Sequence, residues 1–205
     1  MIAALIIRDV RRGLTAAAWL PIAFFLLVAT LIPFAIGPDA RVLARVGPGV
    51  LWIAALTAAL LPIERLVEPD RADGMLDQLA LHGLAEESIA FAKMVAHWLT
   101  FAPLLFIAAV PASALVAMDG SALTKTELAL AIGTPALAAL AVAVAAVTAG
   151  LPRAGSLAGL LLLPLAVPLL IFGAANALLL EAAVSLLLVA GAPFVAGAAI
   201  RASRT

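Results

Sequence analysis

Charged side chains are scarce in this sequence, and cysteine is absent. Only 12% of the 205 residues are charged, whereas 66% are hydrophobic, and the mean hydropathy is +1.22. A soluble domain of this size could not cover so much apolar surface. Without cysteine there are no disulfides, no thiolate metal sites and no Cys-x-x-Cys-His haem attachment. Twelve basic residues balance twelve acidic ones, so nucleic acid is not an expected partner.

Long apolar runs fill most of the chain and predict an all-α integral membrane protein. Their continuity is typical of spanning helices, because the strands of a membrane barrel would alternate apolar and polar residues. A span needs about 20 residues, so the last apolar stretch, 156–200, holds two, with the hairpin near Asn176 and Glu181. We therefore expect residues 1–205 to form one transmembrane domain with spans at about 18–36, 46–63, 94–117, 127–150, 156–175 and 182–200.

Residues 1–17 place Ile2, Leu5, Ile6 and Val10 against charged side chains. This pattern predicts a short amphipathic helix that lies in the membrane interface. The following apolar run is as long as a full span, and no small-residue cleavage site follows it. We therefore interpret this run as a retained first helix rather than a signal peptide.

The distribution of basic residues predicts the orientation. Six spans place both termini on one side, together with the loop at 64–93 and the turn at Leu151–Ser156. That side would carry Arg8, Arg11, Arg12, Arg65, Arg71, Lys93, Arg153, Arg201 and Arg204, and the other side Arg41, Arg45 and Lys125. Nine basic residues against three indicate that the termini and the loop are cytoplasmic.

The stretch from Glu64 to Trp98 is the only long polar segment, and a soluble partner would dock there. It contains seven of the twelve acidic residues and both histidines. We expect its first part, 64–93, to be a coupling segment in which Asp73-Gly74 begins an amphipathic helix that ends at His82. Its candidate contact residues are Asp73, Gly74, Leu76, Asp77, Gln78 and Leu79, with the two leucines entering an apolar groove of the partner. The alternative interpretation is a solvated loop with interfacial anchors.

Other residues are candidates for a structural or path-lining role. Glu64 and Arg65 follow the second span, and Arg65 could pair with a nearby carboxylate. Lys93 and His97 share one helix face at i,i+4, although a lone histidine near a helix end is usually a packing residue. Pro164 and Pro168 also share a face. They favour a hinged helix that lines a path, but proline is common in membrane helices.

Catalytic and nucleotide-binding patterns are missing. The segment Gly120–Thr126 lacks the glycine that precedes the lysine of a P-loop, and no His-Glu-x-x-His motif occurs. We identify no catalytic residues, no metal ligands and no cofactor-binding residues, and no carboxylate or lysine falls clearly in the middle of a span. The chain is thus expected to be a non-catalytic subunit, and the energy for any uphill transport must come from a partner.

The order of several short motifs resembles the haem exporter protein B family, the membrane-spanning subunit of the ABC-type complex of cytochrome c maturation. The resemblance extends over nearly the whole chain. Departures occur at Pro62 and after Leu79. The motifs are Ile36-Gly37-Pro38, Leu43-Ala44-Arg45, Pro48–Trp52, Glu64-Arg65-Leu66, Asp73–Leu79, Ala92-Lys93, Ala96-His97-Trp98, Gly133-Thr134-Pro135 and Leu163–Phe172.

The resemblance implies a six-helix, ABC-2-type permease of the bacterial inner membrane, coupled to ATP hydrolysis by a separate soluble ATPase subunit. It also implies a membrane haem-handling subunit and a small single-span subunit as partners, and a second copy of the chain is a further candidate. Haem would be exported, or a haem-loaded chaperone released. With only two histidines in the chain, we place stable axial haem ligation on a partner. Two alternatives remain: a general ABC-2-type permease for a lipid or glycan, and a non-transport membrane scaffold.

Overall fold

The computed structural model describes residues 1–14, 19–152 and 154–203, and these residues form helices joined by short turns. The long helices are α2 (Trp19–Ile36), α3 (Ala40–Leu60), α6 (Glu86–Leu115), α7 (Gly120–Thr148), α8 (Ala154–Ala174) and α9 (Leu178–Ala202). The short elements are α1 (Ile2–Gly13), the 3-10 turn η1 (Ile63–Arg65), α4 (Glu68–Ala72) and α5 (Met75–Leu81). Residues 15–17 of the expected entry helix, the first residue of the expected first span, Arg153 and Arg204 lie outside the described residues.

Six helices are long and apolar enough to cross a membrane: α2, α3 and α6 to α9. This confirms the all-α membrane fold. Helices α6 and α7 begin before the expected span starts at 94 and 127, because each continues through polar residues outside the apolar stretch. Asp119 caps α7 by accepting a hydrogen bond from the Ala122 N–H at 2.7 Å, which lowers the pKa of this carboxyl.

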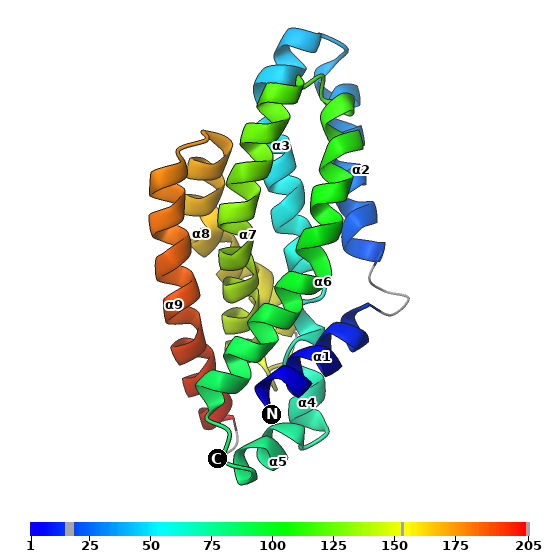
Figure 1. Ribbon diagram of the computed structural model, residues 1–205. Coiled ribbons are helices and arrows are strands. Elements are labelled where there is room, and N and C mark those ends of the chain that lie inside the picture. The colour runs from blue at the N-terminus through cyan, green and yellow to red at the C-terminus, as the bar shows by residue number, and fades with distance from the viewer. Residues whose placement is uncertain (15–18, 153, 204–205) are drawn as a thin grey trace.

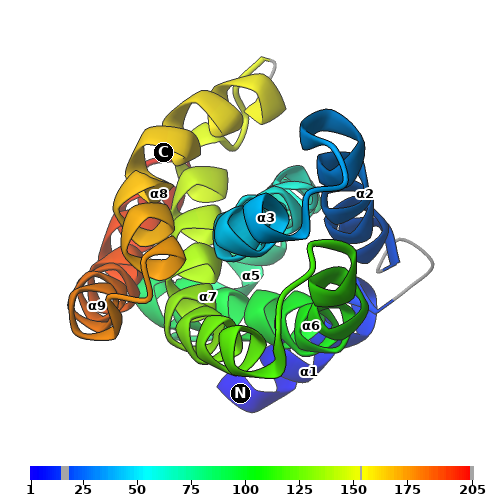
Figure 2. The same cartoon turned by 90° about the horizontal axis from the view of Figure 1, so that it is seen from above.

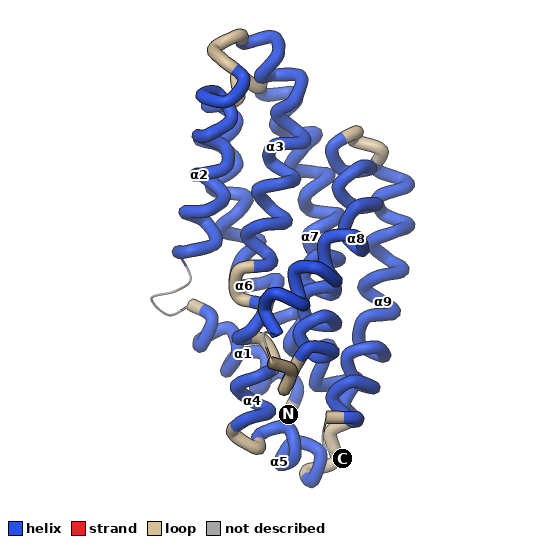
Figure 3. Tube along the Cα trace, turned by 180° about the vertical axis from the view of Figure 1, so that it is seen from behind, coloured by secondary structure: helices blue, strands red, loops and turns tan. Residues whose placement is uncertain are grey.

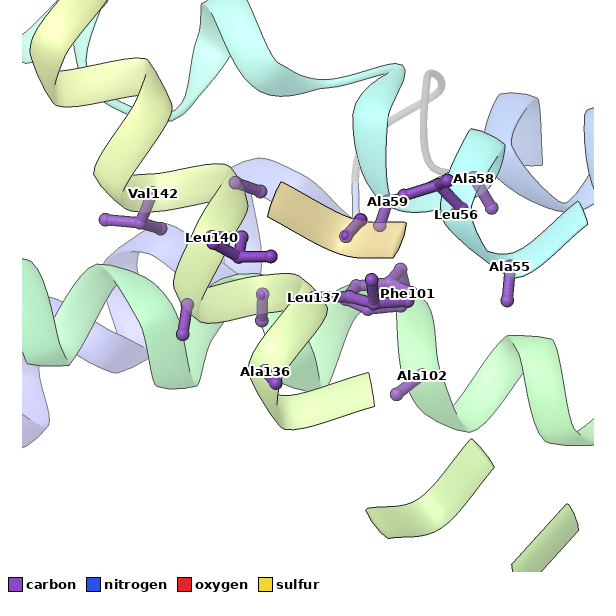
Figure 4. Packing of buried hydrophobic residues seen from close by; sticks show 14 of the residues in the cluster. Ala55, Leu56, Ala58, Ala59, Phe101, Ala102, Ala136, Leu137, Leu140 and Val142 are labelled. Atoms are coloured by element: carbon purple, nitrogen blue, oxygen red, sulfur yellow. The ribbon is translucent and has the colours of Figure 1, made fainter. Parts of the chain in front are cut away.

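Helices α3 and α7 lie inside the bundle, with α2 and α6 on one side and α8 and α9 on the other (Figure 2). Alanine fills much of α7 between Ala136 and Ala146, and these residues are buried. Small side chains allow neighbouring helices to approach closely in a membrane protein. Figure 4 labels Phe101 of α6, Leu137 of α7 and Ala59 of α3, which all belong to this buried core.

Trp52 of α3 is the largest fully buried side chain, and two glycines make room for it. A Cβ at Gly133 of α7 or at Gly173 of α8 would overlap the indole ring. The same Cβ at Gly133 would lie 2.6 Å from Oε1 of Glu181. Helices α7 and α8 therefore meet the indole of α3 at positions where only glycine fits.

The last two spans are joined by a turn at residues 175–177, in which Asn176 has a φ of 52°. Asparagine tolerates this left-handed conformation better than most residues. Glu181, which we expected in the hairpin, instead lies in the first turn of α9. Its side chain is fully buried, and neither oxygen has a hydrogen-bond partner in the described part of the chain. Glu181 is therefore a buried carboxylate near one end of α9, not in the middle of this span.

Both chain ends lie at the same end of the bundle, together with α1, α4 and α5 (Figure 1). The view from behind shows the same grouping (Figure 3). The loops between α2 and α3 and between α6 and α7 lie at the opposite end. This arrangement agrees with an even number of spans and places the polar segment beside the termini.

Candidate functional site

The polar segment between α3 and α6 folds as two short helices beneath the bundle (Figure 1). Helix α3 ends at Leu60, before Pro62, and α4 then begins with Pro69 in its first turn, where proline costs no hydrogen bond. Gly74 and Gly83 flank α5 with φ values of 69° and 79°, which favour glycine.

Helix α5 is amphipathic, as the sequence predicts, but its leucines do not all face outward. Leu76 is 1% exposed and packs into the core of the chain itself, and Leu79 is half-buried against the same core. The exposed apolar residue is Leu81, at 86%. Its exposed neighbours are Asp77 and Gln78. The structure therefore corrects the role expected of Leu76: it anchors α5 to the membrane domain and cannot enter a groove of a partner.

Asp70 of α4 is the centre of a buried ion-pair cluster that sequence analysis did not identify. Its carboxylate accepts hydrogen bonds from Arg8 at 2.5 Å, from Arg12 at 3.0 Å and from Lys93 at 2.5 Å. Asp70 is 3% exposed and Lys93 is 4% exposed. Asp9 adds a second carboxylate, 2.6 Å from Arg8 and 3.5 Å from Lys93. We call these five residues the Asp70 cluster.

The Asp70 cluster joins three elements that are far apart in the sequence. Arg8, Asp9 and Arg12 lie on α1, Asp70 lies on α4 and Lys93 lies on α6. Buried charges are stable only when they are paired and hydrogen-bonded, and here each buried charge has an opposite partner. Partial burial lowers the pKa of Arg8, but the hydrogen bonds and negative charges of Asp9 and Asp70 outweigh burial and raise it overall.

A second set of contacts ties α4 to the turn between α7 and α8. Glu68 pairs with Arg71 at 2.6 Å. The other oxygen of this carboxylate accepts the backbone N–H of Gly150 at 2.7 Å. Helix α4 is thus fastened to α1 and α6 through Asp70 and to the end of α7 through Glu68.

Lys93 and His97 share one face of α6, as expected, and both side chains are buried. Both line a cavity of about 310 Å³ between α1, α4, α6 and the start of α2. Nε2 of His97 has no hydrogen-bond partner in the described residues. The ring lies beside Phe101, with centroids 4.8 Å apart.

The remaining candidates have different surroundings from those expected. Arg65 lines the same cavity but forms no ion pair within residues 1–14, 19–152 and 154–203, so the expected carboxylate partner is missing there. Glu64 is exposed and reaches towards Gly155 at the start of α8. Pro164 and Pro168 lie on the exposed face of α8, and neither lines the cavity of Lys93 and His97.

Sequence analysis missed the Asp70 cluster because its members are far apart in the sequence. Asp70 follows a proline in a polar stretch, where a carboxylate is ordinarily solvated. The signal for its role lies far away in the sequence, in the basic residues of α1 and in Lys93.

The described residues contain no group of three or more His, Cys, Asp or Glu side chains that could hold a metal ion.

Comparison with known proteins places this architecture in a family. The family description "CcmB protein" matches residues 1–203. The chain is 42% identical to "Heme exporter protein B" of Paracoccus denitrificans over 212 residues, which cover 97% of each protein. The Rhodobacter capsulatus protein of the same name gives the same identity and coverage. The Escherichia coli K12 protein is 42% identical over 155 residues, covering 76% of this chain and 70% of the relative. From this agreement along nearly its whole length, the chain belongs to the CcmB protein family.

Proposed function

We propose that this chain is the membrane-spanning permease subunit of an ABC-type complex that exports haem for cytochrome c maturation. The name of its relatives, heme exporter protein B, supports haem as the cargo. Six helices of spanning length support a permease. The observation that carries the proposal is the α4–α5 segment, which presents an exposed face at the end that holds both termini.

The outward face of α5 is the docking surface for a soluble ATPase subunit in this proposal. Leu81 supplies the exposed apolar anchor, and Asp77 and Gln78 supply polar groups beside it. Apolar anchors near the centre of an interface carry most of its binding energy. Leu76 fixes α5 to the membrane domain from the opposite side. The docking surface is therefore presented on a helix that cannot move alone.

Coupling follows from the contacts of α4. When the ATPase binds and hydrolyses ATP, its closure displaces α5, and α4 moves with it. The Asp70 cluster passes this movement to α1 and α6, and Glu68 passes it to the α7–α8 turn. ATP itself binds to the partner subunit. We expect the helices to have a second packing arrangement, because such alternatives convert a small displacement at one site into a larger helix rearrangement.

The proposed setting is the bacterial inner membrane, with both termini and α5 in the cytoplasm, because basic residues concentrate at that end. The partners are the soluble ATPase, a membrane haem-handling subunit and a small single-span subunit, with a second copy of this chain as a further candidate. The ATP-driven step would either move haem or release a haem-loaded chaperone on the far side.

A single substitution on α5 tests the docking surface. In cells that express the whole complex, Leu81→Asp should lower the amount of ATPase that co-purifies with this chain by about tenfold or more, because it places a charge at an apolar anchor. Leu81 is exposed, so the membrane part should still elute as a folded species in size-exclusion chromatography. Thr124→Asp, an exposed position at the opposite end, adds the same charge and should leave the yield unchanged.

The composition of the purified complex separates the proposal from its rivals. An ATPase recovered together with a haem-handling membrane protein supports the proposal. An ATPase recovered without one would favour a permease for another cargo, such as a lipid or glycan. Activity that survives a hydrolysis-deficient ATPase would favour a scaffold. Full ATPase yield with Leu81→Asp would show that α5 is not the docking element.

A further inference from the structure

The cavity beside the Asp70 cluster has a charged, exposed rim and a buried floor. Arg12, Arg65 and Pro69 on the rim are exposed, whereas Pro21, His97 and Phe101 on the floor are buried. The volume of about 310 Å³ exceeds what a few waters would occupy. An occupant of this cavity would therefore meet cationic groups first and a mostly apolar surface below them.

The charges around the cavity are unequally matched. Asp9 and Asp70 are engaged by Arg8, Arg12 and Lys93 within the Asp70 cluster. The Arg65 side chain, which lines the cavity, has no ion pair or hydrogen bond in the described part of the chain; only its backbone N–H is engaged, by the Pro62 carbonyl at 2.8 Å. The rim thus has a surplus positive charge that the protein itself does not neutralise, which favours an anionic occupant.

His97 gives an independent indication of a ligand. The residue is 4% exposed, lines the floor, and has no hydrogen-bond partner for Nε2 among the described residues. A buried polar group without a partner is costly, and most such groups are satisfied by protein, water or ligand. The ring nitrogen would be satisfied by a polar atom located just below an anionic group.

The depth of the cavity in the membrane identifies the class of ligand. Pro21 lies in the first turn of the spanning helix α2, and Pro62 follows the end of α3. Helix α1, which forms one wall, is amphipathic and has exposed Ile2 and Ile7, and Leu14 just after its end is exposed too. The cavity therefore opens where lipid head groups meet acyl chains. Phospholipids are the abundant molecules at this depth that combine an anion with an apolar body.

We propose that this cavity binds an anionic phospholipid of the leaflet on the side of the chain termini. Arg65, with the exposed side of Arg12, contacts the phosphate. Nε2 of His97, in the tautomer that carries its proton there, donates to an ester oxygen below the phosphate. Pro21 and Phe101 contact the beginning of an acyl chain. The lipid would then hold α1 against α6 beside the Asp70 cluster. This inference does not depend on the nature of the exported cargo.

Native mass spectrometry of the full chain tests the site. The chain is reconstituted in nanodiscs of equal parts phosphatidylglycerol and phosphatidylcholine and released with its retained lipids. The wild-type chain should retain phosphatidylglycerol in preference to phosphatidylcholine. Arg65→Gln should lower this preference about fivefold, the effect of removing one cation near an anionic head group. Arg45→Gln, an exposed arginine near the opposite end, should leave it unchanged.

Two further measurements keep the proposal falsifiable. His97→Phe keeps an aromatic ring but removes the nitrogen, and it should lower lipid retention without a change in charge. Excess inorganic phosphate should not displace the lipid, since the apolar floor contributes to binding. Equal retention of the two lipids, equal effects of Arg65→Gln and Arg45→Gln, or displacement by phosphate alone would each overturn the proposed site.

Discussion

Two groups of ion pairs hold the same end of this molecule together, and they differ in burial. The Asp70 cluster joins α1, α4 and α6 with a carboxylate that is almost inaccessible to solvent. Arg201 of α9 pairs with Glu86 at 3.1 Å and with Glu87 at 2.8 Å, at the start of α6. The Arg201 side chain is 58% exposed. Ion pairs between basic side chains and carboxylates thus occur both buried and exposed to solvent at this end of the molecule.

The difference in burial determines what each group can do. Water and salt screen the Arg201 pairs, so each charge keeps most of its hydration when the pair opens. In the Asp70 cluster, the loss of one partner leaves another charge buried and unpaired. The exposed pairs can therefore break and reform at little cost. The buried cluster is costly to open and so links α1, α4 and α6 firmly, which is the contact that the coupling proposal requires.

The largest effect is expected from Asp70→Asn, which removes the shared anion of the cluster. Lys93 would keep only the 3.5 Å contact with Asp9, and we expect a loss of about 3 kcal/mol or more in the free energy of unfolding. Denaturant titration of the purified chain in detergent micelles measures this loss. A loss as small as that of an exposed pair would contradict the importance given to burial.

The double variant Asp70→Asn with Lys93→Met is the matched control for this prediction. Removing the buried cation together with its partner should restore part of the lost stability, because no unpaired charge then remains at position 93. A double variant that is less stable than Asp70→Asn alone would show that the cluster is held by packing rather than by charge.

A smaller effect is expected when one Cβ atom is added at a tightly packed glycine and, for comparison, at an open one. Gly133→Ala adds a Cβ against the buried Trp52 and Glu181, and such overpacking costs about 1 to 3 kcal/mol. Gly159→Ala in α8 adds the same atom where no other group lies within 4 Å, and it should be neutral or stabilising. Thermal unfolding of both variants in the same detergent measures the contrast. Equal melting temperatures would contradict the packing described for Trp52.

The smallest effect is expected from Arg201→Gln, which removes both exposed pairs at once. We expect its melting temperature to remain close to that of the wild-type chain in buffer with physiological salt, since solvent screens these charges. A repeat at low ionic strength should enlarge the difference slightly. A loss as large as that of Asp70→Asn would show that exposure does not weaken these pairs.

Local sequence patterns predict the helices of this protein better than its polar contacts. The apolar runs and the spacing around Leu76 indicate the spans and α5, since they depend on residues that are close in sequence. The Asp70 cluster brings residue 8 into contact with residue 70, and no local pattern indicates such a pair. Leu76 and Leu81 lie on the same short helix, yet only the packing of α5 decides which is buried. Glu181 was expected in the hairpin because its side chain is polar, but α9 already begins at Leu178 and the residue is buried in the bundle.

The most direct test of the central claim is cross-linking from position 81. The natural chain has no cysteine, so Leu81→Cys provides the only thiol of the chain, and Lys125→Cys provides a matched thiol near the opposite end. In membranes that contain the whole complex, a short thiol-to-amine cross-linker should join position 81, but not position 125, to the ATPase subunit, with a yield that changes on adding nucleotide. Equal cross-linking from the two positions, or none from position 81 in an intact complex, would contradict the assignment of α5 as the docking element.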